Sequence, residues 1–239
     1  NGLRRAGGGA KYYLPVVEPV DFDGVLEPGV ETRPTPPGTT RGPGVRVRAD
    51  AGPTGLARAA RASAVLDAGN VNARPLDPYL LGALLGDGGL TGGSIRFSTA
   101  DVELIDMLRA RRPETTEWVQ VAGSPYDYRL RTPVPGRNAA VAALRLLGLW
   151  GESSLTKHVP QAYLLAPVPD RWALLAGLLD TDGSSDARGI VEFSTSSPDL
   201  AADVRFLVQA LGGTVTTTVR ETTGAPSHRL FLRLPVDSE

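Results

Sequence analysis

Two nine-residue segments of this chain are near copies of each other. They are LLGALLGDG at 80–88 and LAGLLDTDG at 175–183. Each is typical of an apolar helix that ends in Asp-Gly. Small residues at the third and seventh positions share one face because they are four residues apart. Two such helices can pack closely, which would bring Asp87 and Asp182 together at one end of their contact.

The expected pair of carboxylates has a chemical consequence. Two carboxylates held close together repel each other unless a cation lies between them. Carboxylate pairs that require Mg²⁺ indicate phosphodiester chemistry. An Asp before Gly is also an ordinary signal for a helix end or turn, so one segment alone would not support this interpretation.

The repetition continues beyond the two segments. Phe-Ser-Thr follows Asp87 at 97–99 and follows Asp182 at 193–195, each time at the end of a short alternating strand. An amphipathic helix is expected after each triplet. The first spans 101–112 with Val102, Ile105 and Leu108 on one face, and the second spans 198–211 with Leu200, Val204, Leu207 and Leu211. Helix, strand and helix in the same order indicate two copies of one unit.

These residues resemble the LAGLIDADG (dodecapeptide, DOD-type) homing endonucleases, in the form embedded within inteins. Lys157-His158-Val159-Pro160, just before the second segment, is similar to the Lys-x-Ile-Pro block that intein endonucleases carry there. The three blocks occur in the order of the family. The resemblance covers about residues 77–239.

The resemblance implies an α+β fold of two αββαββ repeats related by a pseudo-twofold axis. We expect the first repeat at 77–170 and the second at 171–239. The second is apparently truncated, because nothing after it corresponds to the helix expected at 138–149. Pro75 and Pro78 frame the entry to the first motif helix, with Asp77 as its N-cap.

The resemblance also implies a catalytic centre and a substrate. Asp87 and Asp182 would each bind Mg²⁺, while Lys157 would stabilise charge or tune a water molecule. Gly86 and Thr181 would complete the metal ligands. Leu85 stands where the second motif has Asp180, so Asp180 is given no catalytic role. The substrate would be a long asymmetric site in double-stranded DNA, cut by a monomer.

Basic strand faces are the candidate DNA contacts. Alternation places Arg129 and Arg131 opposite Tyr126, Tyr128 and Leu130, and it places Arg229 and Arg233 opposite Leu230, Leu232 and Leu234. Arg96 lies on the polar face of an earlier strand. In the family such sheets form a saddle over the major groove, where arginine reads guanine. A solvated strand face explains any single arginine equally well.

Residues 1–76 differ in character from the repeats. The segment 12–17 resembles the lead-in from the splicing half of an intein, and 23–44, rich in Pro, Gly and Thr, is expected to be a mobile linker. A helix is expected at 55–66, where Arg58 and Arg61 are interpreted as solvated. Asn1 is not a splicing nucleophile and no His-Asn pair closes the chain. We therefore expect the splicing domain and host protein to be partners in cis, and no self-splicing by this chain alone.

Composition limits the other possibilities. Hydrophobic residues make up 41% of the 239 positions, enough for a real core, and there is no cysteine for disulfides or thiolate metal sites. No apolar run approaches the roughly 18 residues of a membrane helix, so no membrane partner is expected. We expect a cytoplasmic protein that associates with the nucleoid when it is on DNA.

The sequence does not match three other motifs that its residues partly suggest: an EF-hand, a nucleotide-binding loop and a histidine metal site. The segment that begins at Asp180 has glycine at position four of an EF-hand loop instead of six, and Val191 stands in place of its final Glu. The glycines at 86–92 lack the preceding strand and the Lys-Ser/Thr of a nucleotide loop. A histidine metal site would need both His158 and His228, and nothing in the sequence suggests that they meet.

Two other functions stay open. The net charge of −1 argues against DNA binding, since nucleic-acid binders usually carry an excess of basic residues. An inactive family member that acts as a DNA- or RNA-binding module would fit this charge and the truncated repeat. A structural insert of an intein that no longer binds nucleic acid is the other alternative.

Overall fold

A computed structural model describes residue 20 and residues 74–133, 137–185 and 190–235. The lead-in at 12–17, the linker at 23–44 and the helix expected at 55–66 lie outside the described residues. None of the helices in the described ranges is long and apolar enough to cross a membrane.

The first repeat consists of three helices and a small antiparallel sheet. Its elements are α2 (Pro78–Gly86), β1 (Ile95–Ser98), α3 (Val102–Arg111), β2 (Glu117–Gln120), β3 (Asp127–Arg131) and α4 (Ala139–Leu146). The strand order is β1-β3-β2, with Ile95 opposite Leu130 and Trp118 opposite Leu130 on the other side. Both neighbours of the central strand therefore place apolar residues on the same inner face.

The second repeat has one more strand in its sheet than the first repeat. After the short helix α5 (Gln161–Leu164), its elements are α6 (Val168–Asp182), β4 (Gly183–Ser185), β5 (Val191–Thr195), α7 (Pro198–Ala210), β6 (Thr214–Arg220) and β7 (Ser227–Arg233). In α6, β5, α7, β6 and β7 it has the same order of elements as α2 to β3 in the first repeat. The antiparallel order is β4-β5-β7-β6. From α6 to β7 this is a full αββαββ unit, and no helix equivalent to α4 follows it in the described residues up to 235.

The α+β fold of two repeats is therefore confirmed, with one local difference. The first repeat has no strand equivalent to β4 among its described residues, only an isolated bridge between Gly89 and Arg96. The segment 88–93 contains four glycines. Glycine disfavours regular strand structure because it gives up the most backbone entropy and offers no side chain to pack.

Polar caps begin the helices that carry the repeats. The Asp77 side chain accepts a hydrogen bond from Leu80 N, with Pro78 at the first helical position, which confirms the expected entry to α2. Asp101, Asn138 and Ser197 cap α3, α4 and α7 in the same way. Each cap satisfies amide groups that the first helical turn leaves without a partner.

Two side chains predicted to lie inside are exposed. Val102 is 67% exposed, because α3 buries Leu104, Ile105 and Leu108 and Val102 lies to the side of that face. Tyr126 is 56% exposed: its carbonyl oxygen accepts a hydrogen bond from Thr99 N at 2.9 Å, but its side chain lies just before β3 and outside the core.

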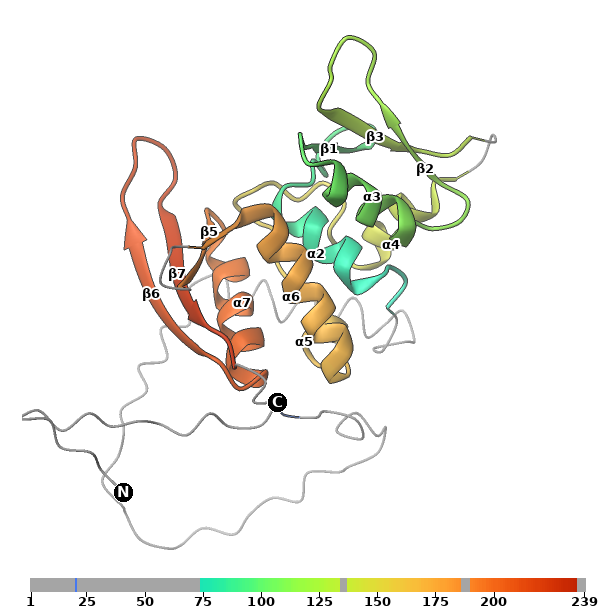
Figure 1. The fold of residues 1–239 in the computed structure, drawn as a ribbon. Coiled ribbons are helices and arrows are strands. Elements are labelled where there is room, and N and C mark those ends of the chain that lie inside the picture. Colours follow the sequence, from blue (N-terminus) through green and yellow to red (C-terminus); the bar gives the residue numbers. More distant parts are fainter. Residues whose placement is uncertain (1–19, 21–73, 134–136, 186–189, 236–239) are drawn as a thin grey trace, which may run out of the picture.

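One hydrophobic core joins the two repeats. Its buried members come from both motif helices, both sheets and the packing faces of α3 and α7. Helices α2 and α6 lie side by side at the centre, with the two sheets on either side of them (Figure 1). The arrangement places the ends of the two motif helices together in the middle of the molecule.

Candidate active site

Two glycines allow the motif helices to touch. A Cβ built on Gly82 would overlap the carbonyl oxygen of Leu174, and a Cβ on Gly177 would overlap that of Tyr79. Leu174 and Tyr79 each lie three residues before the glycine of their own helix, so the contacts are reciprocal. This reciprocity is the signature of a pseudo-twofold axis that passes between α2 and α6.

The ends of the two helices bring the predicted acids to one cavity. Asp87 is the C-terminal cap of α2, where its amide donates to Ala83 O at 3.1 Å, and Asp182 is the last residue of α6. Both line a cavity of about 230 Å³. Asp87 is exposed, whereas Asp182 is half-buried.

Lys157 lies in the same cavity and is only 5% exposed. Its Nζ donates hydrogen bonds to Leu84 O at 3.0 Å and to Gly86 O at 2.8 Å, the last carbonyls of α2. A cation suits this position because the C-terminal end of a helix carries partial negative charge. The structure therefore brings the three predicted catalytic side chains together.

The electrostatics of the cavity are those of a desolvated cluster. Burial and the neighbouring Asp87 raise the pKa of Asp182 to about 6, against an opposing effect of Lys157. Burial also raises the pKa of Asp87. Burial lowers the pKa of Lys157 to about 8, although both acids oppose this shift. Each shift disfavours the charged form, as expected for ionisable groups taken out of water.

The second repeat holds the lysine segment in place. The Ser197 hydroxyl donates to Lys157 O at 2.6 Å while it caps α7, and Asp203 of α7 accepts from Val159 N at 2.8 Å. Asp203 is only 1% exposed. Neither residue was predicted from the sequence. An acid on the apolar face of the helix expected at 198–211 was the available signal, because a buried carboxylate needs partners.

Hydroxyl groups form another part of the cavity wall that was not predicted from the sequence. They come from the loop before Lys157, from the end of β5 and from β7, and they are Ser154, Ser194, Thr195, Ser196 and Ser227. Ser194 and Thr195 belong to the repeated Phe-Ser-Thr triplet, which was interpreted only as a strand end. Hydroxyls here can donate to anionic oxygens next to the two acids.

The predicted metal ligands, Asp87, Asp182, Gly86 and Thr181, fit a divalent cation in part. Two carboxylates with raised pKa values favour the approach of a positive ion, which would stabilise their charged forms. The Gly86 carbonyl already accepts from Lys157. The Thr181 hydroxyl donates to Gly177 O at 3.1 Å and Leu178 O at 3.0 Å. No group of three or more His, Cys, Asp or Glu side chains capable of holding a metal occurs in the described part of the chain.

The predicted arginines differ in how they are engaged. Arg96 and Arg129 are exposed and lie opposite each other on β1 and β3. Arg131 donates to Glu117 at 2.7 Å. In the second repeat, Arg229 makes a fork of bonds to Glu192 at 2.5 and 2.8 Å, and Arg233 is exposed.

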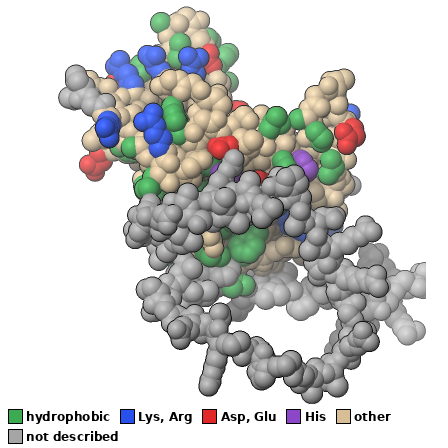
Figure 2. Space-filling view, turned by 180° about the vertical axis from the view of Figure 1, so that it is seen from behind, with side chains coloured by type: hydrophobic (Ala, Val, Ile, Leu, Met, Phe, Trp, Pro, Cys, Tyr) green, Lys and Arg blue, Asp and Glu red, His purple; other side chains and the backbone are tan. Residues whose placement is uncertain are grey.

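Basic side chains gather on the surface formed by the first repeat, as Figure 2 shows from behind. Because Arg131 and Arg229 are already neutralised by acids, the candidate arginines do not form one uniform basic surface. Arg96, Arg129 and Arg233, which make no ion pair within the described residues, carry the stronger claim to contact an anion.

The fold and the cavity define a pseudo-twofold α+β protein with an acid from each repeat at its axis. The family model described as a LAGLIDADG-like domain matches residues 170–234, in the second repeat. The resemblance of the sequence to LAGLIDADG proteins is thereby confirmed.

Similarity extends to two replicative DNA helicases named DnaB. The one from Mycobacterium intracellulare is 36% identical over 163 residues, which are 64% of this chain and 24% of the helicase. The one from Nostoc sp. is 32% identical over 152 residues, or 56% of this chain and 17% of that protein. The chain thus spans less than a quarter of the length of either relative.

Among solved structures, the homing endonuclease I-DmoI is similar. A structure of mesophilic I-DmoI variants matches with a TM-score of 0.46 and 15% identity, covering 67% of this chain and 89% of that one. I-DmoI in complex with DNA and Mn matches with a TM-score of 0.45 and 16% identity, covering 69% and 91%.

Proposed function

We propose that this chain is a site-specific DNA endonuclease, the homing endonuclease region of an intein, and that it makes Mg²⁺-dependent double-strand breaks in a long asymmetric DNA site. One observation carries the proposal. The repeated motif helices deliver Asp87 and Asp182 to a single polar cavity, with the buried cation of Lys157 beside them.

The residues of the cavity divide the chemistry as follows. Asp87 and Asp182 would hold Mg²⁺, with Gly86 and Thr181 as further ligands; Gly86 lines the cavity together with the two acids, whereas Thr181 is next to Asp182 but is not part of the lining. When bound, the ion supplies positive charge against phosphodiester oxygens and lowers the pKa of a nearby water molecule. Lys157 places a proton donor next to the developing negative charge. The half-buried position of Asp182 limits water around the reacting group.

The sheets of the two repeats would bind the DNA. Arg96, Arg129 and Arg233 would contact it directly, while Arg131 and Arg229 would do so after releasing their acidic partners Glu117 and Glu192. Two unequal repeats in a monomer suit an imperfectly palindromic target. We assign 77–170 and 171–239 as the two repeats and 1–76 as a flanking segment.

The similarity to DnaB helicases supports an intein context. A chain that matches only 24% of a replicative helicase and carries a LAGLIDADG-like domain is consistent with a segment inserted in such a host. The splicing domain and the host would then be partners in cis, and the enzyme would act in the cytoplasm at the nucleoid.

A direct test is cleavage of a randomised double-stranded DNA library at low salt with Mg²⁺. We expect cutting by the wild type and none by Asp87→Asn or Asp182→Asn, with DNA binding in Ca²⁺ retained. Asp106→Asn is the matched control, because Asp106 is an exposed acid of α3 that pairs with Arg109 and does not line the cavity. Cutting by both cavity variants would remove the acids from the mechanism.

A second candidate is a non-cleaving DNA- or RNA-binding module. The lack of a helix equivalent to α4 after β7 in the described residues favours it, whereas the net charge of −1 and the pairing of Arg131 and Arg229 with acids weigh against nucleic-acid binding of any kind. Binding of duplex DNA without cleavage under all metal conditions would support this function. Failure to bind heparin or duplex DNA at low salt would leave only a structural insert.

A further inference from the structure

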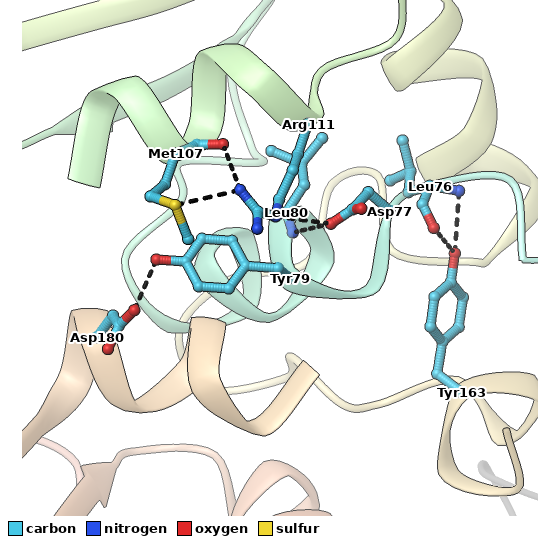
Figure 3. Close-up of polar contacts among 8 residues, drawn as sticks. All are labelled: Leu76, Asp77, Tyr79, Leu80, Met107, Arg111, Tyr163 and Asp180. Carbon is cyan, nitrogen blue, oxygen red and sulfur yellow. Dashed lines mark hydrogen bonds and ion pairs between the residues drawn. The ribbon is translucent and has the colours of Figure 1, made fainter. Parts of the chain in front are cut away.

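The contact between α2 and α6 is not the same on its two sides. Equivalent residues of the two helices are 95 positions apart, as Gly82 and Gly177 are. On one side, Tyr79 Oη donates a hydrogen bond to Asp180 Oδ2 at 2.6 Å (Figure 3). The positions related to this pair by the pseudo-twofold axis are Leu174 and Leu85. A polar pair on one side thus corresponds to two leucines on the other.

Because Tyr79 is buried, its hydroxyl depends on Asp180 as a hydrogen-bond acceptor. Tyr79 is only 4% exposed, so its hydroxyl needs an acceptor inside the contact. Asp180 is exposed, which lets its second oxygen stay in water. Leu85 and Leu174 are completely buried. Neither leucine position could accept a bond from a phenol.

A third helix fixes the direction of the tyrosine. The Arg111 guanidinium of α3 lies over the Tyr79 ring, 4.8 Å from its centroid. Arg111 is itself bonded to Met107 O and Sδ, and its Nε lies 3.8 Å from Asp77 Oδ1 (Figure 3). The ring is therefore held from the side of the first repeat and its hydroxyl points across to the second.

We propose that the Tyr79–Asp180 bond selects pairing of the first repeat with the second over pairing of like repeats from two chains. In a contact of two α2 helices, each Tyr79 would face Leu85 of the other copy and lose its acceptor. In a contact of two α6 helices, each Asp180 would face Leu174. Only the mixed contact, in which α2 packs against α6, gives the Tyr79 hydroxyl an acceptor and Asp180 a donor. A buried polar residue sets partner choice in packed helices in this way.

This inference concerns assembly, and it is tested without cleavage activity. The sharpest variant exchanges the two residues that differ, as Leu85→Asp with Asp180→Leu. In this variant, a mixed contact places Tyr79 against the leucine at position 180 and places the aspartate at position 85 against Leu174. Like contacts satisfy both groups, since Tyr79 meets an aspartate and Leu174 meets a leucine. We expect the variant to change from monomer to dimer in sedimentation at rising concentration.

A compensated variant distinguishes pairing from misfolding. Adding Tyr79→Leu and Leu174→Tyr to the exchange moves the whole polar pair to the other side of the axis. The mixed contact is then satisfied again, so this variant should return to monomer with restored thermal stability. Asp180→Asn is the matched control, because an amide oxygen still accepts from Tyr79 and the chain should stay monomeric.

A cysteine reporter identifies which helices meet. Gly86 and Thr181 face each other across the axis, and the chain has no cysteine of its own. Thr181→Cys therefore faces glycine in a mixed contact and a second cysteine in a contact between two α6 helices. Thr181→Cys is added to the exchange variant and, as the parent, to the wild type. We expect the exchange variant to form at least about ten-fold more disulfide-linked dimer than this parent.

Either of two results would overturn the proposal. One is an exchange variant that stays folded and monomeric, with no more crosslinked dimer than the parent. The other is a compensated variant that is no more monomeric and no more stable than the exchange variant.

Discussion

Gly82 of α2 lies against the backbone of α6, and Gly177 of α6 lies against the backbone of α2. A Cβ on Gly82 would overlap the carbonyl oxygen of Leu174, three residues before Gly177, and a Cβ on Gly177 would overlap that of Tyr79, three residues before Gly82. The contact is set by backbone on both sides, and no side-chain rearrangement can relieve an added methyl group. The distance between the two motif helices, and with it the placement of Asp87 against Asp182, depends on these two positions.

Replacing Gly82 or Gly177 by alanine should therefore lower the free energy of unfolding by about 1–3 kcal/mol, the usual cost of overpacking a well-filled interior. The gain in helix propensity from Gly to Ala, about 1 kcal/mol, would offset only part of the clash. Urea unfolding measures the change. Gly93→Ala is the matched control, because nothing lies within 4 Å of a Cβ there. Equal stability of all three variants and the wild type would show that the helices are not in backbone contact.

The buried ammonium of Lys157 should make stability depend on alkaline pH. Its pKa is lowered to about 8 by burial, while an unfolded chain keeps the ordinary value of about 10.4. Between these values the unfolded state binds more protons, so unfolding free energy should rise as pH increases from about 8 to 10. Below pH 8 the full cost of burying the charge is present.

Lys157→Met should remove this rise because it keeps the length of the side chain without the charge. We expect the variant to be the more stable protein at pH 7 and to lose its advantage towards pH 10. Denaturant unfolding at several pH values checks this. Burial raises the pKa of Tyr163 to about 12, although its hydrogen bonding with Leu76 opposes this shift, so Tyr163 stays neutral in the folded protein throughout this range. A parallel pH profile for both proteins would contradict the prediction.

Much of this arrangement follows from the sequence, because the features that define it are local or repeated. The Asp-Gly ends of the two motif segments, the cap at Asp77 and the Lys-His-Val-Pro block are readable one by one. The pairing of Asp87 with Asp182 followed from small residues four apart on two similar helices. Packing of apolar faces against each other then leaves few alternatives.

The remainder depends on contacts between distant segments, which no local pattern contains. Ser197 and Asp203 hold the lysine segment from a helix forty or more residues away. Asp180 was given no catalytic role from the sequence, and the structure shows that it accepts a hydrogen bond from the Tyr79 hydroxyl of the other repeat. Exposure of Val102 depends on where the core ends, and helical periodicity cannot fix that boundary.

The half-buried carboxylate of Asp182 should destabilise the metal-free protein at neutral pH. Its pKa is raised to about 6, above the ordinary value near 3.9, so the folded state binds more protons between these values. Unfolding free energy should therefore fall as pH rises from about 4 to 6. Asp182→Asn should flatten this fall and gain about 1–2 kcal/mol at pH 7, after allowance for solvent screening.

Mg²⁺ should reverse the order of stability of the wild type and Asp182→Asn. If Asp182 is a ligand, Mg²⁺ at pH 7 raises the melting temperature of the wild type and leaves that of Asp182→Asn unchanged. The stabilisation should disappear below pH 6, where the carboxyl group binds a proton. Differential scanning fluorimetry with and without Mg²⁺ measures both effects. An equal Mg²⁺ shift in the two proteins would place the ion elsewhere.

The arginines of the first sheet should contribute unequally to DNA binding. Arg129 is exposed and makes no ion pair within the described residues, whereas Arg131 is held by Glu117 at 2.7 Å. A free guanidinium that meets a phosphate releases counterions, so Arg129→Ala should lower the slope of log affinity against log salt by about 1. Arg131→Ala should lower it by clearly less, because Glu117 already neutralises that charge and would be left unpaired.

Fluorescence anisotropy of a labelled duplex, measured in Ca²⁺ over a range of KCl concentrations, gives the slopes. Glu117→Gln is the informative control, since it frees Arg131 and should move the slope in the opposite direction. If Arg129→Ala and Arg131→Ala change the slope equally, the ion pair does not survive binding, and the whole strand face contacts DNA. If neither changes it, the face is a solvated surface and the DNA lies elsewhere.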